Sequence, residues 1–460
     1  MGNFRPSKCA YKRKTPEDQI SLLPDEILAR ILSFLALKEA GRTSVLSKRW
    51  EHAWTYVSEL NFDALNTIRE MAARGEGYRR GLEIERSKFV NWVNKVLDSH
   101  QTLELISFRI YIDMNDSFRE DLDKWLHYAL DRRVQRLEVN LTRHGSDGFS
   151  DDYALSSEFF VAHASCWSSL KVLILKSVKI SGANVEYLLH NCTSLETLVV
   201  HGSDDLTSLE VRGPPSLALQ HLEILHCSLK SLIVCNAANL ALLKIDDPDK
   251  AVLKNVSGLV HLGFFGCPYG VKDVFQKRFS CCFSKLKVLS LFLAPRRAQE
   301  FEESLPQLPS LKQLSVILGL WYEESMPELT FFFEAAPNLV KFVIKLDYPF
   351  KKMTGSTIEQ QSENSVVVNR GAVQHLKVVE IHGYRGRIEL GLAKYFLKKA
   401  VSLEKFIVDP RYQYTIREGE PWYEGINVRG RQEAIADDGR RCAKDQLSGL
   451  IPSHVTLQIL

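Results

Sequence analysis

Apolar residues recur along most of the chain in the spacing Leu-x-x-Leu-x-Leu, with Val, Ile or Phe at some of the three places. The last two apolar residues of each segment are two positions apart, so they point to the same face of a short β-strand, while the residue between them points to the other face. Each segment therefore predicts one strand with one buried face. Fourteen segments fit the pattern, and they begin at Leu105, Val134, Leu170, Leu195, Leu206, Leu219, Leu229, Leu240, Leu259, Leu286, Leu311, Leu339, Leu376 and Leu403.

The distances between these segments predict how the chain returns from one strand to the next. Outside the middle of the chain most neighbours begin 25 to 29 residues apart, which leaves room for a short helix and lies within the ~20–29-residue range of leucine-rich repeats. Between Leu195 and Leu240 the segments begin 10 to 13 residues apart. That is too close for a helical crossover, so we expect tight coil in the returns there.

One such segment cannot be stable alone. Burying one Leu contributes about 1.5–3 kcal/mol, which is less than the cost of ordering the roughly 25 residues around it. Stacked segments share one interior. The sequence therefore predicts an α+β fold, in which a small N-terminal helical module precedes a solenoid. The solenoid is expected to be a curved parallel β-sheet with irregular helices and coils on its outer side.

The helical module is predicted from the first sixty residues. Pro24 followed by Asp25 and Glu26 is typical of a helix start, because the N–H that proline lacks is not needed there and acidic groups face the positive end of the helix dipole. Apolar residues recur every three or four positions over residues 27–35, and a second helical stretch covers residues 45–54. A module of about 40 residues is small for independent stability, so we expect it to need a partner.

Three runs in this module are similar to an F-box of the plant F-box/leucine-rich-repeat type: Gln19-Ile20-Ser21-Leu22-Leu23-Pro24-Asp25-Glu26-Ile27-Leu28, Ile31-Leu32-Ser33-Phe34-Leu35 and Thr43-Ser44-Val45-Leu46-Ser47-Lys48-Arg49-Trp50. The resemblance implies the substrate receptor of an SCF-type ubiquitin ligase. The F-box would dock on a Skp-family adaptor and through it on a cullin, and the repeats would bind a protein target whose identity the sequence does not reveal. The resemblance further implies adaptor contacts at Leu23, Pro24, Ile27, Leu28, Ile31, Val45, Leu46 and Trp50. Because the module is small, we expect some of these residues to form its core as well.

The C-terminal part carries a second resemblance. This part contains the run Leu376-Lys377-Val378-Val379-Glu380-Ile381-His382-Gly383-Tyr384 and a further group of apolar residues around Leu403. Both are similar to the FBD region that follows the repeats in many of these plant proteins. Val455, Leu457 and Ile459 alternate like a final strand. The predicted organisation is a disordered basic tail (1–18), an F-box (19–62), a helical linker (63–102), leucine-rich repeats (103–369) and FBD-like repeats with a cap (370–460).

Charge and composition exclude several other classes of protein. The net charge of +3 is carried by five basic residues within the first fourteen positions, so the rest of the chain lacks the broad basic surface that nucleic acid requires. No stretch approaches the ~18 uninterrupted apolar residues of a membrane span. The nine cysteines form no C-x-x-C pair and the N-terminus resembles no signal peptide, so we expect a reduced protein of the cytoplasm and/or nucleus.

The sequence offers no enzyme motif. His163-x-x-Cys166 and His226-Cys227 are the nearest approaches to metal-ligand spacing, and neither has a second pair of ligands at a matching distance. We therefore expect no catalytic residue, no metal and no cofactor. Binding is expected instead at variable positions of the repeats, which carry charges of both signs: Lys171, Glu196, Glu210, Glu223, Lys230, Lys244, Lys287, Lys312 and Lys341.

Two other functions remain open. The repeats would serve equally well in a scaffold that binds a protein without promoting its turnover. A receptor that uses a small molecule to join a target to the repeats is a further alternative. The tight middle of the array and the lack of a basic cluster make that alternative the weaker one.

Overall fold

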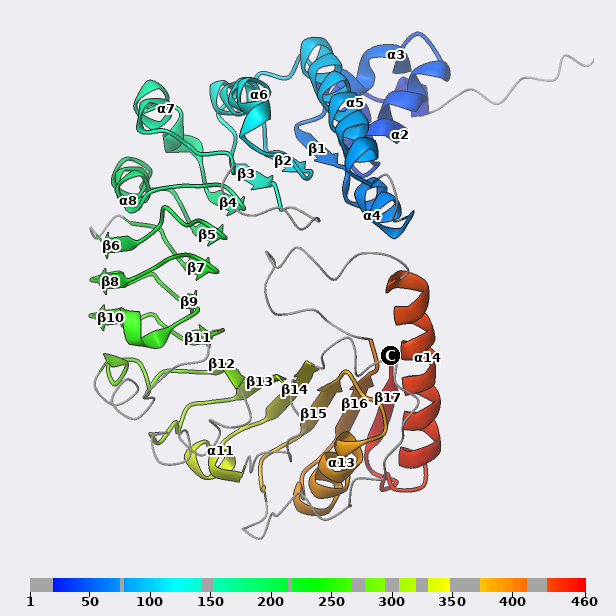
Figure 1. The fold of residues 1–460 in the computed structure, drawn as a ribbon, viewed down its shortest axis with the longest axis vertical. Coiled ribbons are helices and arrows are strands. Elements are labelled where there is room, and N and C mark those ends of the chain that lie inside the picture. Colours follow the sequence, from blue (N-terminus) through cyan, green and yellow to red (C-terminus); the bar gives the residue numbers. More distant parts are fainter. Residues whose placement is uncertain are drawn as a thin grey trace, which may run out of the picture.

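The structure is a computed structural model that describes residues 20–74, 78–142, 152–213, 217–265, 278–293, 306–319, 330–347, 373–411 and 428–460. The predicted tail, residues 1–18, lies outside the described residues. The described chain forms a small helical head, residues 20–57, followed by a repeat array that follows an arc (Figure 1). The predicted α+β class is confirmed.

Three short helices build the head: α1 (Asp25–Leu32), α2 (Leu37–Arg42) and α3 (Trp50–Ala53), joined by 3-10 turns at Ile20–Leu22, Thr43–Val45 and Trp54–Tyr56. Helix α1 begins as the sequence predicts, with extended Pro24 before it and two acidic residues in its first turn. Its buried residues are Leu28, Ala29 and Leu32, which pack against the last 3-10 turn and α3. The opposite side of α1 remains exposed.

A 14-stranded parallel sheet, the main sheet, runs through the whole array. Neighbouring strands pair in the order β1-β2-β3-β4-β5-β7-β9-β11-β12-β13-β14-β15-β16-β17. These strands are β1 (Glu59–Asp63), β2 (Ser107–Tyr111), β3 (Arg136–Asn140), β4 (Val172–Lys176), β5 (Thr197–His201), β7 (His221–Leu225), β9 (Leu242–Ile245), β11 (His261–Phe264), β12 (Val288–Leu293), β13 (Gln313–Gly319), β14 (Lys341–Asp347), β15 (Val378–His382), β16 (Lys405–Asp409) and β17 (Thr456–Ile459).

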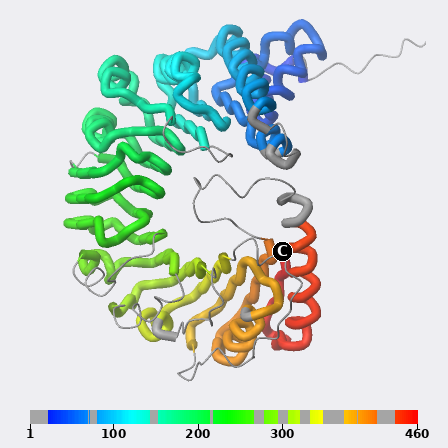
Figure 2. The backbone as a smooth tube through the Cα atoms, viewed as in Figure 1, coloured from blue at the N-terminus to red at the C-terminus, as the bar shows by residue number. Residues whose placement is uncertain are grey.

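The registers of this sheet stack the leucine pattern into one core. Leu173 of β4 pairs with Leu198 of β5, and that residue pairs with Leu222 of β7; all three are almost completely buried. The residues between them, such as Glu223, point to the opposite side of the sheet, which we call the inner face. Helices back the sheet on its other side at both ends of the arc (Figures 1 and 2). They include α6 (Arg119–Asp131), α7 (Ser157–Ala162), α8 (Gly182–Asn191), α11 (Thr330–Ala335) and α13 (Ile388–Lys399). Helices α4 (Leu65–Arg74) and α5 (Tyr78–Ser99) lie beside the N-terminal end of the sheet, and α14 (Val428–Leu447) lies beside its C-terminal end.

The middle of the array differs from the prediction. Its returns are not tight coils but strands of a second, three-stranded parallel sheet, the outer sheet, in the order β10-β8-β6. These strands are β6 (Ser208–Arg212), β8 (Ser231–Cys235) and β10 (Ala251–Lys254). The segments beginning at Leu206 and Leu229 form β6 and β8, so they alternate in the chain with strands of the main sheet. Twelve of the fourteen predicted segments lie in the main sheet, which β1 and β17 complete.

The outer sheet forms because its residues alternate with a period of two. Leu209 and Val211 of β6 and Leu232 and Val234 of β8 bury one face against the core, while the residues between them are exposed or half-buried. The turns that follow β8 and β10 hold Asn236 and Asn255 in the left-handed region, with φ of 57° and 54°. Asn255 Nδ2 donates to Asn236 Oδ1 at 2.9 Å, so one turn is stacked on the next.

Candidate functional site

The head exposes most of its large apolar side chains. Eight of the fifteen exposed large apolar residues in the described part of the chain lie between residues 20 and 46. Val45 and Phe34 are 88% and 82% exposed. The eight residues, which we call the head patch, are Ile20, Leu22, Ile27, Ile31, Phe34, Leu35, Val45 and Leu46. So many exposed large apolar side chains on one small module indicate a protein interface.

The residues predicted to contact an adaptor divide into two groups. Ile27, Ile31, Val45 and Leu46 belong to the head patch, and Pro24 is exposed beside them. Leu23 is half-buried. Leu28 and Trp50 are 0% and 7% exposed, and both belong to the core that the head shares with the array. The structure therefore assigns Leu28 and Trp50 to the interior of the head, because α1 turns that side toward α3 and the last 3-10 turn.

Four members of the head patch were missed by the sequence prediction: Ile20, Leu22, Phe34 and Leu35. Their signal was present in the sequence, since they continue the same apolar runs. An apolar run in a small module does not show by itself which residues face inward. The core contacts of α1 decide that question.

An ion pair joins two segments of the head beside the head patch. Arg49 Nη2 lies 3.0 Å from Asp25 Oδ1, and the same guanidinium donates to the Leu23 carbonyl. These contacts join the start of α1 to the turn before α3. Both side chains are partly exposed, so the pair contributes about 0–1 kcal/mol to stability. Its effect is to hold the two halves of the head patch in one arrangement.

The head is attached to the array by several independent contacts. Lys38 Nζ of α2 lies 4.5 Å from the centre of the Trp92 ring on α5, and that ring meets Phe62 of β1 edge to face at 5.2 Å. Gln101 N donates to the Thr55 carbonyl at 2.9 Å. Strand β1 directly follows the last turn of the head and pairs with β2. The predicted linker holds α4 and α5, and α5 packs on β1 rather than separating the two parts.

The inner face carries a buried carboxylate at its centre. Glu223 of β7 accepts hydrogen bonds from His201 Nε2 at 3.0 Å and His221 Nε2 at 3.1 Å, and Lys244 Nζ lies 2.9 Å from the same carboxylate. Burial alone would raise the pKa of Glu223, but the two histidines and the lysine outweigh burial and lower it. The group is therefore a fixed negative charge that joins three neighbouring strands, β5, β7 and β9.

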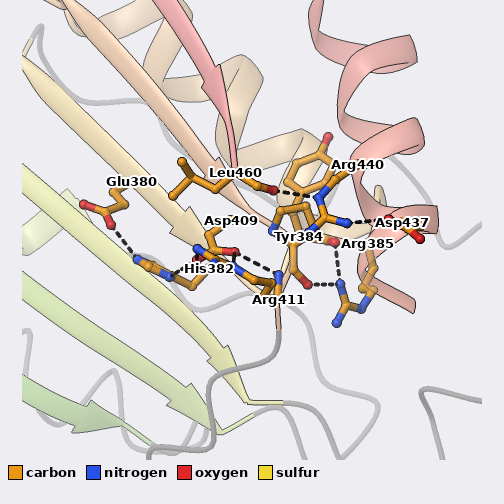
Figure 3. Close-up of polar contacts among 10 residues, drawn as sticks. Glu380, His382, Tyr384, Arg385, Asp409, Arg411, Asp437, Arg440 and Leu460 are labelled. Atoms are coloured by element: carbon orange, nitrogen blue, oxygen red, sulfur yellow. Dashed lines mark hydrogen bonds and ion pairs between the residues drawn. The ribbon is translucent and has the colours of Figure 1, made fainter. Parts of the chain in front are cut away.

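A second polar cluster lies at the C-terminal end of the inner face (Figure 3). His382 Nε2 lies 2.7 Å from Glu380 Oε1, and His382 Nδ1 lies 3.6 Å from Asp409 Oδ2. Arg411 donates to both oxygens of Asp409 at 2.8 and 2.9 Å. Burial lowers the pKa of His382, although Glu380 acts in the opposite direction. For Asp409 burial would raise the pKa, but Arg411 outweighs it and lowers it.

A third cluster occupies the N-terminal end of the inner face. Arg109 of β2 lies 3.1 Å from Glu138 of β3 and 3.6 Å from Asp63 of β1, and Arg136 lies 3.1 Å from Glu138. The three clusters alternate with less polar stretches, such as Ile174 of β4. The inner face is therefore a mixed surface in which charges are already paired.

The charged positions predicted for binding are only partly on this face. Glu223, Lys244 and Lys341 lie there, and Lys341 Nζ is 2.8 Å from Glu380. Glu210 belongs to β6 and Lys230 directly precedes β8, so both lie on the outer sheet. The prediction that these two residues share a binding surface with Glu223 is wrong, because it assumed a single sheet.

Comparison with known families identifies both parts of the chain. An F-box domain model matches residues 20–61. The leucine-rich-repeat domain model of At1g61320/AtMIF1 matches residues 155–460. The chain belongs to the F-box/leucine-rich-repeat family. The FBD resemblance agrees with names found among its relatives, and β15 and β16 continue the main sheet through that region.

The relatives of this F-box/leucine-rich-repeat chain are proteins of Arabidopsis thaliana. F-box protein At5g03100 is 31% identical over 45% of this chain and 63% of its own length. FBD-associated F-box protein At4g10400 is 30% identical over 51% of this chain and 57% of its own length. The match therefore spans less than two thirds of either relative. F-box/LRR-repeat protein 13 is 25% identical over 88% of this chain and 92% of its own length.

Nothing that would bind a metal stands out in the part of the chain that the structure describes, where no group of three or more His, Cys, Asp or Glu is arranged as a metal site. His163 Nδ1 is within 2.8 Å of the Phe159 carbonyl of its own helix. Burial raises the pKa of the Cys227 thiol to about 12, so it is not an activated nucleophile. No helix among the described residues is long and apolar enough to cross a membrane.

Proposed function

We propose that this protein is the substrate receptor of an SCF-type ubiquitin ligase. The head binds a Skp-family adaptor, which connects it to a cullin, and the array binds a protein target for ubiquitination. The observation that carries the proposal is the head patch, which leaves eight large apolar side chains exposed on a module with little core of its own. A surface of this kind is stabilised when a partner covers it.

The attachment of the head supports a receptor role. Because β1 follows the head directly and pairs with β2, a target on the array stays at a fixed distance from the adaptor. A receptor needs this geometry, since ubiquitin transfer happens on another subunit. In this proposal the chain supplies no catalytic group and holds no cofactor.

The target is expected on the inner face. Carboxylates there, such as Glu223 and Asp409, are already paired with basic side chains. A target must therefore match a pattern of paired charges and apolar stretches rather than neutralise one strong field. This favours a folded protein surface over a small anionic ligand.

The proposal is tested by co-purification of the full chain with a recombinant Skp-family adaptor. The double variant Val45→Asp with Leu46→Asp places two charges in the head patch without touching the core. Each buried apolar contact contributes about 1.5–3 kcal/mol, so we expect at least about a 100-fold loss of affinity. The matched control is Val161→Asp on α7, which is also exposed but lies outside the head; it should bind normally.

The outcomes separate the alternatives. Failure of the wild-type chain to bind any Skp-family adaptor would overturn the proposed function. Normal binding by the double variant would show that the head patch is not the contact surface. If adaptor binding is lost in the variant while the half-life of a captured target stays unchanged in cells, the protein acts as a scaffold instead.

A further inference from the structure

The residues directly before the strands of the main sheet form a row along one edge of the array, which we call the rim. Neighbouring rim residues are joined by a repeated pair of backbone hydrogen bonds. The Lys287 carbonyl, for example, accepts from Lys312 N at 2.8 Å and from Gln313 N at 3.0 Å. Rim residues are therefore stacked at the ~4.8 Å spacing of neighbouring strands. Their side chains are close enough to interact with one another.

Charged residues of the described rim occur in neighbouring pairs, and two of these pairs combine opposite charges. Lys171 is followed on the next strand by Glu196, and Lys377 is followed by Glu404. Lys377 Nζ lies 2.7 Å from Glu404 Oε1, so side chains on neighbouring rim positions do meet. In both pairs the backbone hydrogen bonds are the same as those between Lys287 and Lys312.

The pair at β12 and β13 instead combines two positive charges. Lys287 and Lys312 are both exposed, and neither forms an ion pair within the described chain. Lys285, also exposed, adds a third ammonium group, whose Nζ donates to the Ser257 carbonyl at 3.3 Å. Like charges on neighbouring strands repel each other. A local conflict of this kind, with no compensating contact in the chain, is typical of a functional surface.

We propose that Lys285, Lys287 and Lys312, the basic rim, bind an acidic segment of the protein target. Carboxylates one turn apart on a helix are ~5–6 Å from each other, which matches the ~4.8 Å between neighbouring rim positions. Val260 and Val340 flank the two central lysines on the rim and are half-buried. They offer apolar contact to the residues on either side of the acidic ones.

The amount of charge favours a protein segment over nucleic acid. Proteins that bind duplex DNA neutralise roughly 6–10 phosphates, and the basic rim supplies three ammonium groups. Lys341, the next basic residue along the sheet, is already held by Glu380 at 2.8 Å. The basic rim is therefore a local site for a few carboxylates. The inference rests on the proposed function only in calling the bound protein a target.

The first test is fluorescence anisotropy of a fluorescein-labelled hexaglutamate peptide with the full chain, at about 20 and about 150 mM salt. The wild type should bind, and more weakly at the higher salt concentration. Lys287→Glu with Lys312→Glu should weaken binding at least about 10-fold at the lower one. The matched control, Lys171→Glu with Lys377→Glu, makes the same change in net charge at exposed rim positions. It should bind like the wild type.

The second test separates binding from a structural role. Lys312→Glu alone places opposite charges at the two positions, as in the other rim pairs. Its thermal midpoint should therefore equal or exceed that of the wild type, while its affinity for the peptide should fall. A lower midpoint would show that Lys312 stabilises the array, which would contradict the proposal.

Three further results would overturn the proposal. They are no peptide binding by the wild type at low salt, an equal loss of affinity in the two double variants, and tighter binding of a thymidine hexanucleotide than of the peptide. The second would show a response to net charge alone, and the third would assign the basic rim to nucleic acid. No adaptor is present in these measurements, so their failure would leave the proposed function standing. Loss of adaptor binding would likewise leave the basic rim unaffected.

Discussion

The repeats near the ends of the array are backed by helices, whereas those in the middle are backed by strands. Repeat length accounts for part of the difference: the strand-backed repeats that begin at β5, β7 and β9 have 24, 21 and 19 residues, and the helix-backed repeat that begins at β4 has 25. The periodicity of the return differs as well. Val185, Leu188 and Leu189 of α8 recur every three or four residues, while Leu209 and Val211 of β6 alternate every two. The same sheet is thus covered by whichever element places apolar side chains against it.

The comparison also shows that both kinds of backing fill the core equally. Leu188 of α8 and Leu232 of β8 are both completely buried. If backing strands contribute as much as backing helices, the array should behave as one cooperative stack rather than two halves joined by a weak middle.

The largest expected effect tests this directly. Leu232→Ala removes a buried side chain from the central strand of the outer sheet and should cost about 2–5 kcal/mol. Leu188→Ala in α8 should cost a similar amount. Denaturant unfolding of both variants measures the two values, and a cost near zero for Leu232→Ala would mean that the outer sheet is only a loosely attached cover.

A smaller effect is expected where the two kinds of backing meet. Gly182 begins α8, and a Cβ atom there would lie 1.8 Å from the Ser208 carbonyl oxygen of β6. Gly182→Ala must therefore displace backbone, which costs about 1–3 kcal/mol. Gly41→Ala in α2 is the control, because nothing lies within 4 Å of its Cβ position; it should be neutral or slightly stabilising. Thermal unfolding distinguishes the two variants.

Acid should weaken the strand-backed middle in two separate pH windows. Burial and the nearby Lys244 lower the pKa of His261 to about 4, from about 6.5 in the unfolded chain. The folded state binds fewer protons, so the contribution of His261 is complete above about pH 6.5 and is lost as the pH falls toward 4. His261→Gln should flatten the stability profile in this window.

Glu223 acts at lower pH. Its pKa also lies below that of the unfolded chain, so its contribution is complete above about pH 4.3 and falls as the pH drops further. Glu223→Gln should flatten the profile below that value, and because the Glu223 charge acts to raise the pKa of His261, its removal should also extend the His261 window to lower pH. Urea unfolding between about pH 3 and pH 8, which covers the His261 window and the upper part of the Glu223 window, provides the measurement. Identical profiles for both variants and the wild type would contradict the assignment of the two pH windows to His261 and Glu223.

The smallest effect concerns the turns of the outer sheet. Asn255→Ala removes the hydrogen bond to Asn236 and leaves a non-glycine residue at positive φ, which should cost about 1 kcal/mol. Asn255→Gly loses the same bond but tolerates the backbone, so it should cost less. If both variants cost the same, the hydrogen bond alone accounts for the stability of the turn.

The sequence predicted the main sheet because its signal is local. Leu173 and Leu175, two residues apart, bury the same face wherever the strand lies in the stack. The prediction failed for the segments at Leu206 and Leu229, because a strand with alternating apolar residues has the same sequence pattern in either sheet. Which sheet receives it depends on the strands before and after it in space, and spacing along the chain does not contain that information.

The prediction of the candidate site was limited in a similar way. Ile27 and Val45 are exposed as an interface requires, and Leu28 lies in the core although it is adjacent to Ile27. The family resemblance places such residues in one group, because it shows that a position is restricted to certain residue types and does not show the physical reason for the restriction. The inner-face network around Glu223 was out of reach, because its partners His201 and Lys244 come from strands that only the register brings together.

The strand that joins head and array also determines where the chain can be divided. Leu60 and Phe62 of β1 are buried, although β1 overlaps the end of the residues that match an F-box. A fragment that stops at residue 62 would carry β1 without its neighbour β2, as an edge ready to pair with other chains. A fragment that begins at residue 63 would expose Phe108 and Ile110 of β2 instead. Neither part is a transferable module, and exchanging F-boxes between such proteins would require moving the first strands of the sheet with them.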